Sequence, residues 1–517
     1  MIGSRAPARL ESDRFDVVVI GGGILGAFVA WDASLRGHRT ALIERDDFGS
    51  GTTSASGRVL HGGLRSLQHL EIRSAAESLR ERETLARLAP RLTAPLPFLF
   101  PAAGGGESIL LQAAAVAWRS FARHAEDDLP AARFAQSGSD LPESLRAWAP
   151  CGGLVLHDRQ IIAPERLVLG VLAAAVQDGA VVANRIEATG IITRSGRVEG
   201  VRTRDRVAER DSELLADHVV NVAGPWAPDL WPGGSEGLPR LSFARGAHVV
   251  ADIPPPTAAL GLPWPDEDAG GRIRRARRVF VMPWAGTTLI GASWEPTHPG
   301  PQGPVTPSAA EVGRFVDALS QRWPGLGLER SRVRYAVAGL YPRFGSSGVA
   351  TGGFQVARHP LIVDHRAHGG PKGLVTAIGV KLTTARALAE RIVDRFDGRT
   401  VGASARGRTA TRPPLEFATP SPLSELGFEA ITEPALAAAL ARAAVENEQA
   451  LSLADLFLRR SVAGQFGAPA RDVLEAAAGV LSHGLGWPEG RAAIEVQDFQ
   501  DRYLRWMRGP TETGGSS

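Results

Sequence analysis

The chain has 517 residues, 44% of them hydrophobic and 22% charged, and carries a formal net charge of +3. These values are ordinary for a globular protein of two or three domains and give no indication of nucleic-acid binding. The single cysteine, Cys151, excludes an intramolecular disulfide and a Cys/His zinc site, so we expect no metal.

The sequence contains neither an apolar run of 18 residues nor an apolar segment near its N-terminus. We therefore expect no membrane-spanning helix and no secretory signal, and the cytoplasm is the expected compartment. Two segments leave peripheral membrane contact open, the basic cluster 272–278 (RIRRARR) and the amphipathic stretch 107–122. Their ordinary alternatives are a solvated turn and a surface helix.

A βαβ unit is predicted near the start of the chain. Residues 16–20 (DVVVI) are typical of a buried parallel strand, and a helix is expected from the following glycines to about Arg36. Residues 39–43 (RTALI) predict the second strand, which Glu44 closes.

The remainder of the chain alternates predicted helices, strands and loops. Helices are expected at 71–89 and 164–178, Gly- and Pro-rich loops at 90–106, and short strands from 180 to 223. Further strands are expected at 246–252, 279–283, 288–291, 333–338 and 373–378, the last leading into a helix near Thr383.

The glycines of the βαβ unit have the G-x-G-x-x-G spacing of a dinucleotide-binding loop, at Gly21, Gly23 and Gly26. The first allows a tight turn, the second lets the backbone approach a pyrophosphate, and the third lets helix and strand pack closely. Glu44 can accept hydrogen bonds from a ribose hydroxyl and would repel a 2′-phosphate. The loop alone does not separate FAD from NAD.

Several longer segments carry a family resemblance. Residues 50–66 (SGTTSASGRVLHGGLRS) join a hydroxyl-rich run to His61-Gly62-Gly63-Leu64-Arg65. This segment resembles the FAD-dependent, quinone-linked glycerol-3-phosphate dehydrogenases of the D-amino-acid-oxidase-like superfamily. Matching segments follow in family order, among them NVAGPWA (221–227), RGAHVV (245–250), IGVKLTTARALAE (378–390) and LADLFLRRS (453–461).

The resemblance implies an α/β (α+β) fold, in which a Rossmann-like FAD-binding domain is interleaved with an antiparallel-sheet substrate domain. A linker and an all-helical C-terminal domain, expected to be structural, follow this region of residues 1–400. The implied parts are FAD-binding at about 14–75, 150–240 and 340–400, substrate-binding at about 76–149 and 241–339, linker at 401–425 and helical domain at 426–510.

The resemblance also implies FAD as the cofactor. Ser54 and Ser56 can bond phosphate and the flavin edge, and Gly62 and Gly63 can lie against the flavin ring. Lys381 and the amides after it can stabilise the negative charge that forms when flavin is reduced. The residues expected to contact FAD are Gly21, Gly23, Gly26, Glu44, Thr53, Ser54, Ser56, His61, Gly62, Gly63, Leu64, Ile186, Ala223, Gly224, Lys381, Leu382 and Thr383.

Oxidation of an alcohol by hydride transfer to flavin N5 also needs a base and cations that hold the substrate. The resemblance implies His248 as the base and Arg65 and Arg358 as substrate ligands, with Arg65 and Lys381 in the catalytic group. The ordinary alternatives are a buried strand histidine for His248 and a structural ion pair for Arg65.

Three positions depart from the family pattern. Ser66 replaces a tyrosine, Val380 replaces a glycine, and Tyr341 replaces an arginine that binds the substrate phosphate. Arg343, two residues further along an extended strand, shares the face of Tyr341 and is the expected replacement, so both belong to the expected substrate site.

Three functions follow from these expectations. The first is oxidation of glycerol 3-phosphate to dihydroxyacetone phosphate, with electrons passed to quinone. The second is oxidation of another hydroxy acid, polyol phosphate or amine on the same scaffold, and the third is an inactive flavin-binding protein. The HGGLR and VKLTT segments disfavour an NAD-linked dehydrogenase, and a homodimer is left open.

Overall fold

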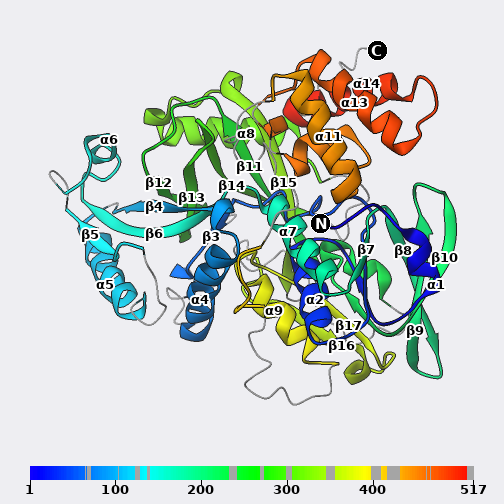
Figure 1. The fold of residues 1–517 in the computed structure, drawn as a ribbon. Helices are drawn as coiled ribbons and strands as arrows, with labels where there is room; N and C mark the ends of the chain where they lie inside the picture. The colour runs from blue at the N-terminus through cyan, green and yellow to red at the C-terminus, as the bar shows by residue number, and fades with distance from the viewer. Residues whose placement is uncertain are drawn as a thin grey trace, which may run out of the picture.

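The computed structural model describes most of the chain, and its described strands form two sheets flanked by helices (Figure 1). The structure describes residues 1–64, 66, 71–102, 104–122, 129–136, 140–231, 241–267, 273–297, 305–344, 356–396, 409–415, 431–461, 463–465 and 467–508.

The first sheet has eight strands among the described residues, in the order β16-β17-β10-β1-β2-β7, with β9 also paired to β10 and β8 paired to β9. Strand β1 lies at its centre and runs parallel to both neighbours, so that Ile20 lies beside Ile43 and Asn221. The strands are β1 (Arg14–Ile20), β2 (Thr40–Ile43), β7 (Val181–Ala183), β8 (Ile186–Arg194), β9 (Arg197–Asp205), β10 (Arg210–Asn221), β16 (Leu361–Asp364) and β17 (Leu374–Ile378).

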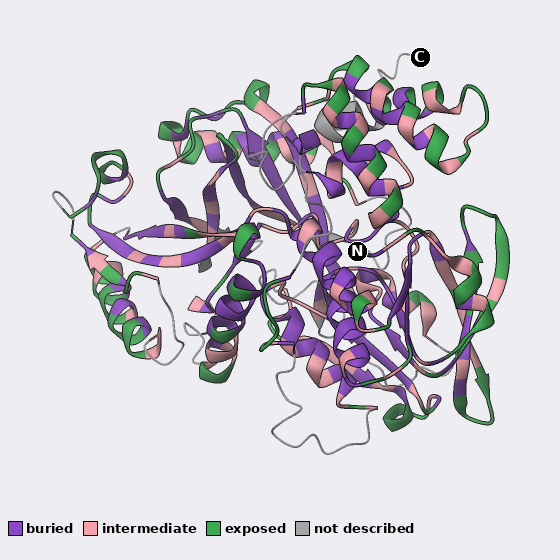
Figure 2. Ribbon diagram, viewed as in Figure 1, coloured by how far each residue is buried: buried purple, intermediate pink, exposed green. Residues whose placement is uncertain are grey.

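Three helices pack together on one face of this sheet: α2 (Ile24–Leu35), α7 (Pro164–Gln177) and α9 (Ala385–Val393). Helix α2 is buried along almost its whole length between its neighbours and the sheet, as Figure 2 shows. Its residues are accordingly apolar apart from Asp32 and Ser34. The predicted βαβ unit and the predicted helix at 164–178 are confirmed.

The second sheet has nine strands among the described residues, in the order β15-β11-β14-β13-β12-β4-β6-β3, with β5 beside β6. The strands predicted at 246–252, 279–283, 288–291 and 333–338 all lie in it. Its strands are β3 (Val59–Leu60), β4 (Thr93–Pro101), β5 (Arg133–Ala135), β6 (Gly153–Ile161), β11 (Leu241–Ala251), β12 (Ala259–Glu267), β13 (Ile273–Trp284), β14 (Thr287–Thr297) and β15 (Val333–Phe344).

The prediction of loops at 90–106 is wrong, because β4 occupies much of that range. Strand β4 pairs with β6 along its whole length, but with β12 only at Phe98 and Leu99. Pro95 and Pro97 lie before that short pairing, in a part of β4 that has no described partner strand on the β12 side. A proline on an unpaired edge loses no hydrogen bond of the sheet. Strand β6 also departs from the expected division, since residues 153–161 belong to the second sheet.

The remaining helices lie around the two sheets. Helix α4 confirms the helix predicted at 71–89, and α5 covers the amphipathic stretch. These helices are α1 (Pro7–Ser12), α4 (Ile72–Leu88), α5 (Gly105–Ala122), α6 (Glu143–Arg146) and α8 (Ala309–Arg322).

The C-terminal helices (orange and red in Figure 1) have a core of their own and pack against both α7 of the first sheet's domain and β15 of the second sheet. They are α11 (Pro434–Glu448), α12 (Leu453–Asp455), which continues as a π-helical turn (Leu456–Arg460), α13 (Arg471–Leu485) and α14 (Arg491–Arg508). Among the described helices, none combines the length and apolar character needed to cross a bilayer.

Candidate active site

A cavity of about 2720 Å³ lies at the carboxyl ends of the parallel strands of the first sheet. Its wall includes the segments that directly follow β1, β2, β10 and β17, and it reaches side chains of the second sheet. In open parallel sheets a ligand binds in this crevice, outside the strand ends. The cavity is therefore the candidate site.

The glycine loop is shaped by contacts that admit no side chain. Gly21 has a φ of +110°, and a Cβ on Gly26 would lie 1.8 Å from the Gly21 carbonyl oxygen. Gly23 is the N-cap of α2, and Thr53 Oγ1 accepts from the Ile24 N–H at 3.2 Å. The N-terminus of α2 thus faces the cavity, where its dipole and N–H groups favour an anion.

Glu44 closes the turn after β2 on the cavity wall. Its carboxylate accepts from the backbone N–H groups of Gly22 at 2.6 Å and Asp46 at 2.8 Å. Burial raises the pKa of Glu44, and these two hydrogen bonds oppose the shift. Each oxygen already accepts one hydrogen bond and keeps capacity for a ribose hydroxyl.

The hydroxyl-rich run contributes three different side-chain roles. Thr53 bonds α2, whereas the Ser54 hydroxyl donates to backbone carbonyls of its own turn, at Gly51 (3.0 Å) and Ser50 (3.3 Å). The Ser56 Oγ is buried without a partner among the described residues and lies on the wall. An unsatisfied buried hydroxyl is costly, so Ser56 fits a polar ligand in the cavity.

His61 and Gly62 are both held by Asp158. His61 Nδ1 lies 3.1 Å and the Gly62 nitrogen 2.8 Å from its carboxylate oxygens, and Arg82 donates to it at 2.9 Å. Burial works against ionisation of Asp158, but these partners outweigh it and lower its pKa. The His61 ring, 48% exposed, lies on the wall with Leu64.

The two glycines after His61 are needed for packing against α4. A Cβ on Gly62 would meet Leu79 at 2.8 Å, and one on Gly63 would lie 2.9 Å from the Ala75 Cα. Gly63 also has a φ of +95°. Close approach to α4 therefore explains both glycines, and Gly63 alone of the two lines the cavity. Arg65 lies outside the described residues.

Lys381 enters the cavity from the turn between β17 and α9. Its Nζ donates to Ser66 Oγ at 3.1 Å and to Ser74 and Ser78 Oγ at 3.4 Å each. Ser66, which replaces the tyrosine of the family pattern, thus has a structural role: its buried hydroxyl accepts a hydrogen bond from Lys381. Val380, Leu382 and Thr383 complete this wall, and Val380 has no left-handed backbone that would require glycine.

His248 faces the cavity from β11, opposite Gly291 of β14. A Cβ on Gly291 would lie 2.2 Å from His248 Cδ2, and one on Gly57 would lie 3.1 Å from Nε2. Burial, with a smaller contribution from the Arg58 charge, lowers the pKa of His248 to about 4. The ring is therefore neutral at pH 7, and its buried Nδ1 has no partner among the described residues.

Arg58 is a wall residue that sequence reasoning missed. It has a φ of +54°, its guanidinium bonds Glu165 at 2.9 Å, and it stacks over the Trp284 ring at 4.6 Å. Only the small residues before it signalled that this turn approaches the cavity. A non-glycine residue held at positive φ is frequent at functional sites.

Of the expected substrate residues Tyr341, Arg343 and Arg358, two line the cavity and one does not. Tyr341 lies on the wall with its ring edge against Trp294, 4.8 Å between centroids, and burial raises its pKa. Arg358 is also on the wall, where its Nη1 lies 3.3 Å from Glu71 Oε1. Arg343 is not among the described wall residues, because the wall formed by β15 ends at Pro342.

The other end of the cavity is lined by the expected residues Ile186, Ala223 and Gly224, close to Glu44. Two features there were not foreseen. Arg45 stacks over the Trp226 ring at 4.7 Å, and residues of the C-terminal helices, among them Leu451, Ser452 and Arg459, form part of the wall. The C-terminal helices, which were expected to be structural, thus also reach the site.

The arrangement accommodates a large dinucleotide. One end offers a helix N-terminus and the Glu44 carboxylate, and the other brings His248 and Lys381 to the same cavity from different sheets. The buried, unpartnered Ser56 Oγ and His248 Nδ1 supply polar atoms that such a ligand would satisfy.

Comparisons with known proteins agree with this geometry. Residues 16–395 match the model of the family described as FAD dependent oxidoreductase. The chain is 30% identical over 434 residues to a glycerol-3-phosphate dehydrogenase of Synechocystis sp., covering 80% of this chain and 75% of that protein. It is 33% identical over 402 residues to glycerol-3-phosphate dehydrogenase 1 of Mycobacterium tuberculosis, covering 75% and 74%.

A solved structure shares the fold over almost the whole length. The glycerol-3-phosphate dehydrogenase from Bacillus halodurans, complexed with FAD, superposes with a TM-score of 0.69 at 21% identity and covers 99% of this chain and 100% of that chain.

Proposed function

Because the chain belongs to the family of FAD-dependent oxidoreductases, we propose that it oxidises glycerol 3-phosphate to dihydroxyacetone phosphate. The names of the similar proteins from Synechocystis and Mycobacterium tuberculosis support this substrate. The observation that carries the proposal is the meeting of His248 and Lys381, from opposite sheets, at one cavity that also holds the glycine loop.

The cavity residues have separate roles in the oxidation of an alcohol. FAD, when bound, supplies the acceptor for the hydride that leaves the substrate carbon. The neutral His248 imidazole takes the hydroxyl proton. Lys381, fixed by three serine hydroxyls, places a positive charge beside the cofactor site.

Arg358 is a cation of the cavity wall that would hold the substrate phosphate, and Glu71 Oε1 lies 3.3 Å from its Nη1. Loss of a charge-assisted pair weakens binding by roughly 10- to 100-fold. We expect Arg358→Met to raise KM for glycerol 3-phosphate by about that factor and to leave weak glycerol oxidation unchanged. Arg343→Met is the matched control, since Arg343 is not on the described wall, and an equal effect of both would refute this assignment.

A second candidate substrate class is favoured by one observation. Tyr341, buried against Trp294, occupies the position where the family resemblance implies a phosphate-binding arginine. A less charged hydroxy acid or polyol would fit that wall better than a phosphate. Anaerobic bleaching of the bound flavin separates the two, with glycerol 3-phosphate, glycerol, lactate and glycine as a panel. Bleaching by glycerol 3-phosphate alone supports the first proposal, and bleaching only by another compound overturns it.

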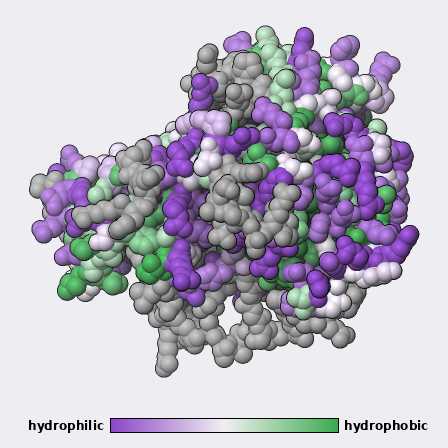
Figure 3. Space-filling model, turned by 60° about the horizontal axis from the view of Figure 1, so that its bottom comes forward, coloured by the Kyte–Doolittle hydropathy of each residue, from purple (hydrophilic) through white to green (hydrophobic). Residues whose placement is uncertain are grey.

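Quinone at a membrane surface is the electron acceptor that the surface supports. Ile109, Leu110 and Val116 of α5 are 70%, 67% and 55% exposed, and Leu110 also lines the cavity. Figure 3 shows hydrophobic surface at the end of the molecule where α5 lies in Figure 1. An apolar helix face beside the cavity suits an amphipathic acceptor and peripheral membrane contact. Ile109→Glu together with Val116→Glu should abolish co-sedimentation with lipid vesicles and reduce turnover with a long-chain quinone, while turnover with a soluble dye is kept.

A further inference from the structure

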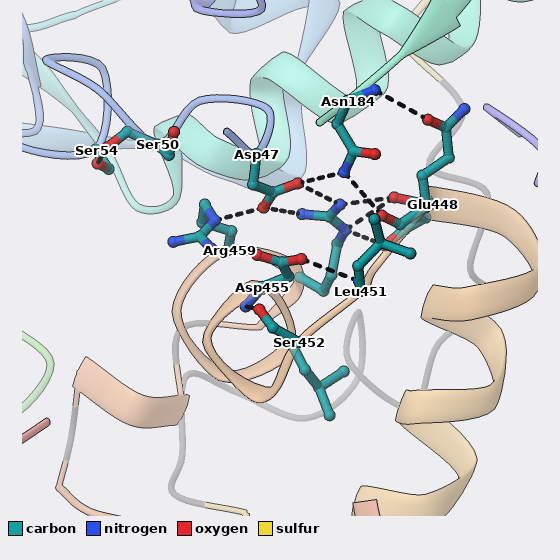
Figure 4. A network of polar contacts seen from close by, with 12 residues as sticks. Asp47, Ser50, Ser54, Asn184, Glu448, Leu451, Ser452, Asp455 and Arg459 are labelled. Carbon is teal, nitrogen blue, oxygen red and sulfur yellow. Dashed lines mark hydrogen bonds and ion pairs between the residues drawn. The ribbon is translucent and has the colours of Figure 1, made fainter. Parts of the chain in front are cut away.

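A buried ion network joins the C-terminal helices to the turn after β2 (Figure 4). Asp47 accepts from Arg460 at 2.7 and 2.8 Å and from Arg459 Nε. Asp455 accepts from Arg185 at 2.7 and 2.9 Å and from Arg459 Nη2. Burial opposes ionisation of Asp47, but the two arginines hold its pKa well below the usual range.

The network carries an excess of positive charge. Glu448 belongs to it, because it accepts from Arg166 at 2.7 Å and lies 3.9 Å from Arg460. Among the residues that the structure describes, the network therefore joins four guanidiniums (Arg166, Arg185, Arg459, Arg460) to three carboxylates (Asp47, Glu448, Asp455), an excess of one positive charge. A buried charge that exceeds its partners is costly unless an anion joins it.

Arg459 is the member placed to receive that anion. Its two carboxylate partners fix Nε and Nη2, while Nη1 makes no hydrogen bond with any described residue. Its side chain is 13% exposed and lies on the cavity wall, as do Ser50, Gly51 and Ser54. Arg460, in contrast, is fully buried and does not line the cavity.

The turn that carries Asp47 also contacts the glycine loop. The Gly49 N–H donates to the Gly22 carbonyl at 2.9 Å, and Phe48 packs where a Cβ on Gly22 would lie. The anion expected at the N-terminus of α2 therefore lies in the same part of the cavity as this turn. Arg459 and the helix N-terminus approach it from different domains.

We propose that Arg459 is a diphosphate-binding residue for FAD, and that the C-terminal domain completes the cofactor site. FAD then binds most tightly to the state in which this domain is docked, so cofactor binding and docking stabilise each other. This inference concerns the cofactor and does not depend on which alcohol is oxidised.

The test compares ADP, which carries the diphosphate, with adenosine, which lacks it. Both displace FAD from the full-length protein, and their dissociation constants follow from the flavin fluorescence released. Arg459→Gln should raise the dissociation constant of ADP by roughly 10- to 100-fold, because a charge-assisted hydrogen bond to phosphate is lost. It should raise that of adenosine by less than about 3-fold, because adenosine has no phosphate. Arg459→Lys, which keeps the charge, should lose less ADP affinity.

Arg166→Gln is the matched control. Arg166 anchors the same domain through Glu448 but does not line the cavity. Its ratio of adenosine to ADP dissociation constants should equal that of the wild type. An unchanged ratio in Arg459→Gln would overturn the proposal, because the arginine would then act only in domain packing.

A measurement on the unaltered chain covers the case in which Arg459→Gln does not fold. Amide hydrogen exchange of residues 451–461 in the full-length apoprotein should slow with ADP and not with adenosine. Equal protection by both ligands, or by neither, would contradict diphosphate binding at Arg459.

Discussion

At the scale of single residues, His248 and Lys381 are each fixed by neighbours that leave little freedom. Gly57 and Gly291 give the His248 ring its space, because a Cβ on Gly291 would overlap the ring and one on Gly57 would crowd it. Ser66, Ser74 and Ser78 surround the Lys381 ammonium with hydroxyl acceptors. Both positions are thus determined by packing partners distant in sequence.

Replacement of His248 tests its role as base. His248→Gln should slow flavin reduction by about 10²- to 10⁴-fold, the usual contribution of a general base. The wild-type rate should not fall from pH 8 to pH 5 on account of this group, since its pKa is about 4 and it stays neutral. Anaerobic rapid mixing measures both quantities.

His365 provides the matched control for that variant. It is also buried with its pKa lowered to about 4, but it bonds Thr376 at 2.8 Å and does not line the cavity. His365→Gln should therefore reduce flavin at the wild-type rate. Wild-type reduction by His248→Gln would remove His248 as the base.

Replacement of Lys381 tests its electrostatic role. Lys381→Met should make the flavin midpoint potential more negative by about 20–45 mV, because about 1–2 kcal/mol of stabilisation of the reduced anion is lost. Ser66→Ala should shift the potential in the same direction by less. Lys372, the other lysine, is exposed and away from the cavity, so Lys372→Met should leave the potential unchanged. Equal potentials in all four proteins would refute the role.

At the scale of elements, the segments with strong local patterns were predicted well. The βαβ unit, α4, α7 and the strand before Lys381 all follow from periodicity and glycine position. Strand β4 was missed because its prolines suggest a loop, and only the pairing partner shows that they occupy an unpaired edge. Local sequence does not carry that information.

Gly26→Ala tests the close contact between β1 and α2. The added Cβ would meet the Gly21 carbonyl oxygen at 1.8 Å, so the loop must move. We expect loss of bound flavin and a destabilisation of about 1–3 kcal/mol, the usual cost of overpacking. Gly479→Ala in α13, where the Cβ would meet nothing within 4 Å, should be neutral or slightly stabilising. Thermal unfolding and flavin content distinguish these outcomes, and a flavin-replete Gly26→Ala of normal stability would contradict the packing argument.

At the scale of the whole molecule, the cavity is built by three parts of the chain that no local pattern connects. The glycine loop, His248 and Lys381 were foreseen from motifs, and the structure brings all three to one wall. Arg58 follows the hydroxyl-rich run and Arg459 lies in the LADLFLRRS segment, but neither was foreseen, because these segments do not show that the arginine reaches the cavity. Their positions follow only from the docking of the second sheet and the C-terminal helices.

Global stability should depend on pH through the buried histidines. In the unfolded chain these histidines take up a proton near pH 6.5, whereas in the folded protein the pKa of His248 and of His365 is about 4. Between these pH values the unfolded state binds more protons, so the free energy of unfolding falls as the pH drops. Asp32, whose pKa burial raises to about 6, acts in the opposite direction below pH 6.

Comparing the free energy of unfolding of His365→Gln with that of the wild type isolates the contribution of His365. Between pH 7 and pH 5, His365→Gln should lose less unfolding free energy than the wild type, by at most about 2 kcal/mol. Urea unfolding at the two pH values measures this difference. An identical loss in both proteins would mean that His365 protonates freely in the folded state.

The most direct test of the central claim is a single turnover with glycerol 3-phosphate deuterated at C2. When the purified protein is mixed anaerobically with this substrate, the visible flavin band should bleach, and more slowly than with the undeuterated compound, because the C2–H bond breaks as the hydride leaves. Absence of bleaching by either compound would contradict the account.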